Sequence, residues 1–220
     1  MPKKNETRKY VLTVEGETEL WYFTWLCDQI NVDPNRVCDV SIDARVQQSP
    51  KKFYKSINAK TTPQVYHVCD VESNDQVHVD KFNKILSEMK EAKSQKKIIY
   101  TLGYSNYAFE LWMVLHKRDC NGPLVHRRKY LAPIKQAFGE QFEDLDHYKE
   151  EAAFKRCLGK LNLDDVKAAI RRAETIARNN KEHNLLIRYK GYSYYKENPA
   201  LSVHEMVSVI LKECGLLPED

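Results

Sequence analysis

The strongest constraint on the fold is the alternation of strand-like and helix-like segments in the first half of the chain. Four runs rich in β-branched and aromatic residues have the length and composition of strands, at residues 8–15, 36–42, 65–69 and 97–102. Apolar residues at helical spacing lie between them, most clearly within residues 78–92. Strands that alternate with helices predict an α/β fold with a mostly parallel sheet flanked by helices.

After the fourth run the pattern becomes helical. Ser105 or Asn106 is expected to cap the next helix. Residues 163–177 place apolar side chains on one face and charged side chains off it, which predicts an amphipathic helix. A capping box formed by Ser202 and Glu205 predicts the start of the last helix.

The length of the chain bounds its organisation. A chain of 220 residues forms one large domain, or one domain with an appendage, and it is long enough to bury a core of its own. The composition shifts near residues 117–127. We therefore expect residues 1–120 to form the α/β core and residues 121–220 to form a mainly helical region packed on that core. The six cysteines include no CxxC pair, which favours reduced core residues over a zinc site.

Composition also excludes several classes of protein. The 35 Lys and Arg residues nearly balance 31 Asp and Glu residues, for a net charge of +4, so affinity for nucleic acid has to come from a local patch. No GxG or GxxxxGK[ST] sequence occurs, which argues against the usual nucleotide-binding loops. The longest stretch without a charge, residues 98–109, is shorter than the roughly 20 apolar residues that span a membrane. We expect a cytoplasmic protein that does not bind membranes.

Acidic side chains follow two of the predicted strands at their carboxyl ends. Glu15 ends the first run, Asp70 ends the third, and Glu72 comes two residues later. Ligands bind beyond the carboxyl ends of the strands in an open α/β sheet, so these carboxylates converge if the two strands are parallel neighbours. Carboxylate oxygens suit Mg²⁺ or Mn²⁺. Such an ion can bind a phosphodiester and lower the pKa of a bound water.

Other interpretations of these segments stay open. Glu17 and Glu19 fit the first turn of a helix, where acids are favourable, and residues 70–75 fit a polar turn. Residues 103–107, GYSNY, lack the second Gly of a nucleophile elbow, which argues against a serine hydrolase. His116 fits a packed or surface histidine better than a partner in acid–base catalysis.

Four segments of the chain resemble a known family. They are VEGETE at 14–19, VCDVE at 68–72, SNYAFELWMVLH at 105–116 and ENPALSVHEMV at 197–207. In this order they resemble the RloB-like proteins, a Toprim-related group of bacterial anti-phage and abortive-infection proteins. The resemblance extends over almost the whole chain and implies a Toprim-like α/β core.

The resemblance also implies roles for particular residues. The wider Toprim fold has a Glu after the first strand and an acidic pair after a later one, which bind Mg²⁺ during cleavage or synthesis of nucleic acids. By position these roles fall on Glu15, Asp70 and Glu72. Glu110 resembles a further acidic contributor, and the resemblance favours Lys190 near the active site.

Two positions depart from the family pattern. Residues 70–72 read Asp–Val–Glu, where the family usually has Asp–Arg–Asp, so a longer acidic side chain replaces one ligand and a phosphate contact is missing. Tyr107 stands where the family commonly has Pro, which should affect only how the following helix begins.

The resemblance implies a Mg²⁺-dependent endonuclease that cleaves RNA or DNA as an effector of bacterial anti-phage defence. A neighbouring-gene ATPase is the expected partner. The alternative is a non-catalytic Toprim-like module that binds nucleic acid or the ATPase.

The segment RYKGYSYYK at residues 188–196 interleaves basic and aromatic side chains. Basic groups neutralise phosphates and aromatic faces stack on bases, which predicts nucleic-acid binding by Arg188, Lys190, Tyr192, Tyr194, Tyr195 and Lys196. A β-hairpin that turns at Gly191, with half-buried tyrosines, is an equal and compatible interpretation. The basic cluster at residues 127–129 fits a solvated helix start better than a contact in a groove.

Overall fold

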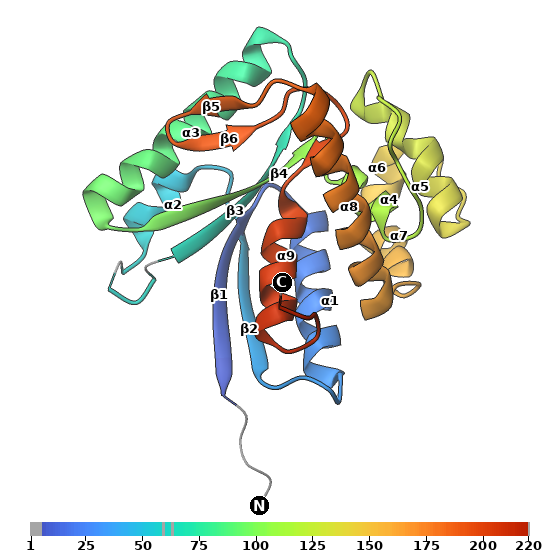
Figure 1. Ribbon diagram of the computed structural model, residues 1–220, viewed down its shortest axis with the longest axis horizontal. Helices are drawn as coiled ribbons and strands as arrows, with labels where there is room; N and C mark the ends of the chain where they lie inside the picture. Colours follow the sequence, from blue (N-terminus) through green and yellow to red (C-terminus); the bar gives the residue numbers. More distant parts are fainter. Residues whose placement is uncertain (1–5, 59, 63, 220) are drawn as a thin grey trace, which may run out of the picture.

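A five-stranded sheet in the order β2-β1-β3-β4-β7 forms the centre of the computed structural model, which describes residues 6–58, 60–62 and 64–219 (Figure 1). Its strands are β1 (Thr7–Val14), β2 (Asp39–Val46), β3 (Gln64–Val71), β4 (Ile99–Asn106) and β7 (Ala200–Leu201). The first four are parallel, and the short β7 pairs antiparallel with the end of β4. The predicted α/β fold with a mostly parallel sheet is therefore confirmed.

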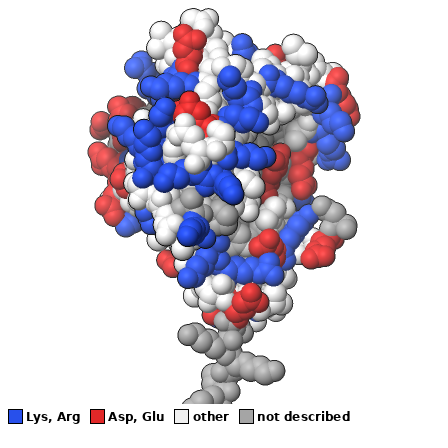
Figure 2. All heavy atoms as spheres, turned by 90° about the vertical axis from the view of Figure 1, so that its left-hand side faces the viewer, with Lys and Arg blue, Asp and Glu red and all other residues white. Residues whose placement is uncertain are grey.

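Helices cover both faces of the sheet. Helices α1 (Glu17–Val32) and α9 (Val203–Glu213) lie on one face, and α2 (Pro50–Ser56) and α3 (Gln76–Lys96) lie on the other (Figure 1). Successive side chains of β3 point to opposite faces of the sheet and so pack against both helical layers. Tyr66 and Val68 join the core beneath α1 and α9, whereas Val65 and Cys69 join the core beneath α2 and α3. Figure 2 looks onto the side that carries α2 and α3, where Lys and Arg intermingle with Asp and Glu.

The order of the strands creates a crevice between β1 and β3. The chain runs from β1 through α1 to the outer strand β2, then returns past β1 through α2 to β3 and continues through α3 to β4. Helix α1 therefore leaves β1 toward one face and α3 leaves β3 toward the other. Neighbouring strands whose following helices diverge in this way leave an opening at their carboxyl ends.

The second half of the chain is mainly helical and belongs to the same core. Its elements are α4 (Glu110–Leu115), the 3₁₀ helix η1 (Arg127–Tyr130), α5 (Leu131–Phe138), α6 (Leu145–Lys149), α7 (Glu151–Leu158) and α8 (Leu163–His183). Trp112, Phe154 and Ile170 from these helices share one hydrophobic cluster with Leu12 and Val14 of β1. Among the described residues, no helix combines the length and the apolar character that crossing a bilayer requires.

Strand β4 extends further than the sequence pattern indicates. Its expected range was 97–102, yet Ser105 and Asn106 are strand residues and neither caps a helix, so that expectation was wrong. Both residues pair with β3 on one side and with β7 on the other, and this two-sided pairing outweighs their preference for a cap. Helix α4 begins only at Glu110.

Strand β2 begins and ends later in the chain than expected, since it spans Asp39–Val46 rather than 36–42. All eight of its residues pair in register with the eight residues of β1. The extent of β1 therefore sets the extent of β2, which the alternation of apolar residues alone does not reveal.

Ser202 connects α9 to the sheet instead of forming a capping box. Its Oγ donates to the carbonyl of Leu102 at 3.1 Å and accepts from the backbone N–H of Tyr104 at 3.1 Å. No side-chain hydrogen bond caps α9, so the predicted pairing of Ser202 with Glu205 was wrong. Backbone groups of β4 that have no partner strand on this side form hydrogen bonds with the Ser202 hydroxyl instead.

This contact predicts the effect of two substitutions on stability. Ser202→Ala should lower the free energy of unfolding by about 1–3 kcal/mol, because the buried N–H of Tyr104 and the partly buried carbonyl of Leu102 lose their partner. Glu205→Ala, at an exposed position of the same turn, should change it by no more than about 0.5 kcal/mol. Urea unfolding of both variants measures the difference. Equal losses of unfolding free energy in the two variants would support the capping box instead.

Candidate functional site

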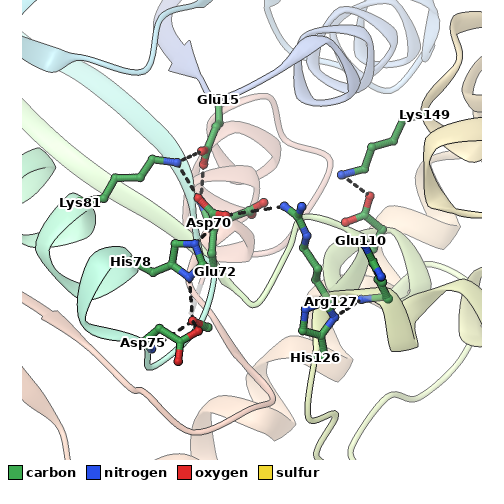
Figure 3. Close-up of polar contacts among 12 residues, drawn as sticks. Glu15, Asp70, Glu72, Asp75, His78, Lys81, Glu110, His126, Arg127 and Lys149 are labelled. Atoms are coloured by element: carbon green, nitrogen blue, oxygen red, sulfur yellow. Dashed lines mark hydrogen bonds and ion pairs between the residues drawn. The ribbon is translucent and has the colours of Figure 1, made fainter.

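The carboxyl ends of β1 and β3 bring the three predicted acidic residues together. The two strands are parallel neighbours, with Leu12, Thr13 and Val14 opposite Tyr66, His67 and Val68. Glu15 follows β1, and its Oε2 accepts a hydrogen bond of 2.9 Å from the backbone N–H of Asp70 (Figure 3). Glu15, Asp70 and Glu72 thus share one rim, at the crevice between the two strands.

Two further glutamates join this rim. Glu19 in the first turn of α1 is 5% exposed, and Glu110 at the start of α4 is 2% exposed. Loss of hydration raises the pKa of Asp70 well above its usual range, and the charges of the three neighbouring glutamates, Glu15, Glu19 and Glu110, raise it further. Loss of hydration and the charge of Glu110 raise the pKa of Glu19 to about 7. The site therefore confines more negative charge than it neutralises.

Lys81 of α3 bridges two of the acids. Its Nζ lies 2.9 Å from Glu15 Oε1 and 2.5 Å from Glu72 Oε1. Burial acts to raise the pKa of Glu72, but the hydrogen bond and the charge of Lys81 outweigh it, and the pKa is lowered. His78 Nε2 lies 3.6 Å from the other oxygen of Glu72. Helix α3 thus supplies the positive charge on one side of the rim.

The helical second half of the chain supplies the positive charge on the other side. Lys149 at the end of α6 holds Glu110 Oε1 at 3.0 Å. Arg127 of η1 places a guanidinium nitrogen 3.6 Å from Glu72 Oε2. Figure 3 shows Arg127 between Glu72 on one side and the pair of Glu110 and Lys149 on the other. The site is therefore built by both halves of the chain.

Two carboxyl groups of the rim keep oxygens without a partner. The carboxylate of Asp70 accepts no hydrogen bond and forms no ion pair with any described residue. Glu110 Oε2 is buried and has no hydrogen-bond partner among the described residues. Unpartnered carboxylate oxygens in an excess of negative charge fit a hard divalent cation such as Mg²⁺ or Mn²⁺.

The side chains as they stand do not form a finished metal site. Across residues 6–58, 60–62 and 64–219, no three His, Cys, Asp or Glu side chains are arranged to hold a metal ion. The ammonium of Lys81 occupies the position between Glu15 and Glu72 that an ion shared by these two acids would take. The residue types therefore fit Mg²⁺, and binding it between these two acids requires Lys81 to move.

A comparison with protein families matches residues 10–210 to the RloB-like proteins. The chain belongs to the RloB-like family. The match covers both the α/β core and the helical region, which confirms the resemblance seen in the sequence. Comparisons with curated proteins and with solved structures gave no match.

Lys190 is not brought to the acidic rim of this RloB-like chain. It occupies, with Gly191, the two-residue turn between β5 (Ile187–Tyr189) and β6 (Tyr192–Tyr194), and both turn residues have positive φ. Its Nζ lies 5.6 Å from the centre of the Tyr189 ring, and Gly191 faces the ammonium of Lys90 on α3. Lys81, Lys149 and Arg127 are the cations at the rim, and a role for Lys190 stays a prediction.

The predicted hairpin exists, and it leaves only part of its aromatic surface free. Tyr194 is 4% exposed and packs edge-on against Phe82 with ring centres 4.9 Å apart, so its assignment to base stacking was wrong. Tyr192 and Tyr195 are half-buried, and Tyr192 Oη donates to the carbonyl of Tyr100. The basic side chains of this segment keep more freedom, since Arg188 and Lys190 are exposed and Lys196 is half-buried.

The sequence interpretation missed four members of the site, namely Glu19, Lys81, Arg127 and Lys149. Glu19 had one available signal, because it lies in the first turn of the helix that begins just after Glu15. Arg127 begins the helix η1 and is exposed, as predicted, and the prediction missed that its guanidinium lies beside Glu72. Nothing near Lys149 in the sequence relates it to Glu110.

The bridge formed by Lys81 predicts how the metal-free protein responds to its loss. Lys81→Met should lower the free energy of unfolding by about 1–2 kcal/mol, because Glu15 and Glu72 lose the cation that they share. Lys84→Met is the matched control, since Lys84 is exposed on the same helix and forms no ion pair with a described residue. Thermal unfolding in EDTA compares the two variants. Added MgCl₂ should stabilise Lys81→Met more than the wild type, and identical behaviour of both variants would contradict the bridge.

The raised pKa of Glu19 predicts a pH-dependent gain of stability. Its carboxyl group takes up a proton on folding between its ordinary pKa of 4.5 and about 7, so this residue destabilises the folded state increasingly as the pH rises through that interval. Glu19→Gln should therefore stabilise the metal-free protein by about 1–3 kcal/mol at pH 8 and by much less at pH 5. Glu17→Gln changes an exposed acid in the same helical turn and should have little effect at either pH. Denaturant unfolding at the two pH values would contradict the assignment if the gain from Glu19→Gln were the same at both.

Proposed function

We propose that this RloB-like protein is an endonuclease that uses Mg²⁺ or Mn²⁺ to hydrolyse phosphodiester bonds in RNA or DNA. The observation that carries the proposal is the convergence of Glu15, Asp70 and Glu72 at the crevice between β1 and β3, with Glu110 beside them. A Glu after the first strand and an acidic pair after the third, on neighbouring parallel strands, is what a Toprim-like core requires. The same resemblance supports a role as an effector of anti-phage defence with an ATPase partner.

Different residues at the rim would bind the metal ion and the substrate phosphate. Asp70 and Glu110 offer the free oxygens that would hold the ion first, and Glu15 and Glu72 would add theirs once Lys81 moves. The bound ion would polarise the phosphodiester and lower the pKa of a coordinated water. Arg127, exposed at the edge of the rim, is placed to bind a phosphate oxygen of the substrate.

Glu19 is better suited than Glu15 to exchange a proton during the reaction. Both oxygens of Glu15 already have partners, in Lys81 and in the backbone N–H of Asp70. Glu19 lines the same cleft and has a pKa near neutrality, where a general base or acid is most effective. Thr18 Oγ1 donates to Glu19 Oε2 at 3.0 Å and orients the carboxyl group.

The hairpin and the second half of α3 offer a surface for the phosphate backbone. Arg188 and Lys190 are exposed on the hairpin, and Gly191 beside Lys190 faces the ammonium of Lys90 on α3. Lys93, Lys96 and Lys97 are exposed further along the same helix and just after it. The face shown in Figure 2 carries many of the basic side chains of the molecule. Basic side chains without acidic partners attract phosphates regardless of base sequence. This surface supports binding of nucleic acid on the face that carries α3, at the opposite end of that helix from Lys81 and the rim.

The alternative function is a non-catalytic module that binds nucleic acid or the ATPase partner. The bridge of Lys81 between Glu15 and Glu72 is the observation that favours it, because an internal ammonium group then takes the place of a metal ion permanently. The Asp–Val–Glu sequence at residues 70–72 points the same way, since it lacks the Arg that the family usually has.

A nuclease assay with matched variants separates the two functions. Asp70→Asn removes one charge and nearly preserves the shape of the side chain, so it should leave the fold intact, weaken Mg²⁺ binding and reduce cleavage about 100-fold or more. Asp75→Asn is the control, because Asp75 is exposed in the following turn and hydrogen-bonds to Ser73. The assay uses the chain freed of its partner, with Mg²⁺ or Mn²⁺, on RNA and DNA. Equal cleavage by both variants refutes the site, and confirmed metal binding without cleavage by the wild type supports the module.

A further inference from the structure

A second cavity adjoins the acidic rim. It has a volume of about 480 Å³ and lies between the start of α4, η1, α5 and α6. Arg127 and Lys149 line both this cavity and the cleft that contains Glu15 and Asp70. The two hollows are therefore adjacent and share a wall that carries two cations.

Two solvent-exposed charged groups in the cavity have no partner among the described residues, and the carboxylates of Glu110 and Asp144 line it beside them. The guanidinium of Arg128 and the carboxylate of Asp146 line it, and neither forms an ion pair or a side-chain hydrogen bond with another described residue. Both side chains are exposed, and they do not pair with each other. Leu131 and Leu145 supply apolar wall between these charges. A free cation, a free acceptor and an apolar wall occur together in one hollow.

These features match the parts of a nucleotide. A phosphate group binds an arginine guanidinium through charge-assisted hydrogen bonds. A carboxylate accepts hydrogen bonds from ribose hydroxyls or from the N–H groups of a base, and aliphatic side chains pack against the base. The volume lies within the range of pockets that hold small organic ligands, about 300–1,000 Å³.

We propose that this cavity binds the nucleotide adjacent to the phosphodiester in the acidic cleft, and the inference rests on the proposed nuclease function. Arg128 binds the phosphate of that nucleotide, Leu131 contacts its base, and Asp146 accepts a hydrogen bond from its sugar or base. A polynucleotide repeats its phosphates along the strand, so the shared wall of Arg127 and Lys149 meets the strand where it passes from one hollow to the other. Arg128 and Asp146 then position the substrate and take no part in bond cleavage.

Binding of mononucleotides to the full-length protein in EDTA tests the cavity without metal and without catalysis. The probes are the four ribonucleoside 5′-monophosphates, their deoxy forms and inorganic phosphate, each titrated by calorimetry. We expect at least one nucleotide to bind about tenfold or more tightly than inorganic phosphate, since it reaches both Arg128 and Asp146. Equal affinity of the ribo and deoxy forms assigns the contact of Asp146 to the base, and a ribo preference assigns it to the sugar.

Matched variants locate the binding. Arg128→Ala should weaken nucleotide binding about tenfold or more, whereas Lys129→Ala, at the exposed neighbouring position outside the cavity, should change it less than about twofold. Asp146→Asn should weaken binding of nucleotides and leave binding of inorganic phosphate unchanged. Circular dichroism confirms that each variant is folded.

The inference is overturned if no nucleotide binds, if Arg128→Ala and Lys129→Ala behave alike, or if nucleotides and inorganic phosphate bind equally. The outcome is independent of the nuclease assay, because the titrations contain no metal. If Asp70→Asn loses cleavage and no nucleotide binds, the proposed nuclease function is supported and the proposed nucleotide site is refuted. If nucleotides bind and the wild type cleaves nothing, the nucleotide site is supported and the nuclease function is refuted.

Discussion

The pairing of β1 with β3 is the constraint on which the site depends. Parallel neighbours end at the same edge, and the helices that follow these two strands diverge, so acids placed after each strand meet in an open crevice. Buried contacts fix the register. Thr13 Oγ1 lies 2.7 Å from His67 Nδ1 between the strands, and loss of hydration lowers the pKa of His67 to about 4, so this buried pair is neutral at physiological pH. A slip of one residue would turn the apolar side chains of β1 away from α1 and move Glu15 off the rim.

Like charges gathered at one rim have to be offset, and the fold does this with cations from three separate elements. Lys81 comes from α3, Arg127 from η1 and Lys149 from α6. Two of the three thus belong to the helical second half of the chain, which completes the site rather than forming a module beside it. The offset is incomplete, because the pKa values of Glu19 and Asp70 remain raised. Groups held at a cost in stability are typical of functional sites.

The sequence predicts what depends on local pattern and on strand ends. The α/β sheet and the meeting of Glu15, Asp70 and Glu72 follow from the alternation of strands and helices. The end of β4 does not follow, because the pairing of Asn106 with β7 joins segments nearly a hundred residues apart. The contact of Lys149 with Glu110 joins residues 39 positions apart, and the five-residue helix α6 has no distinctive pattern that would predict it. Burial of Tyr194 against Phe82 depends on how the hairpin packs on α3. The composition of the hairpin alone does not predict which of its tyrosines is buried.

Under the proposed function, the cations at the rim have two alternative partners. In the structure Lys81 and Arg127 contact carboxylates, which are the oxygens that a divalent ion also requires. Binding of an ion by these oxygens would release Lys81 and Arg127, and the two cations would then be available to phosphate oxygens of the proposed substrate. If the proposed function holds, metal and nucleic acid would bind with positive coupling, because each would remove an interaction that opposes the other. By the same linkage, a chain held in its lysine-bridged state would bind both ligands weakly, and the proposed ATPase partner could restrain it by stabilising that state without blocking the cleft.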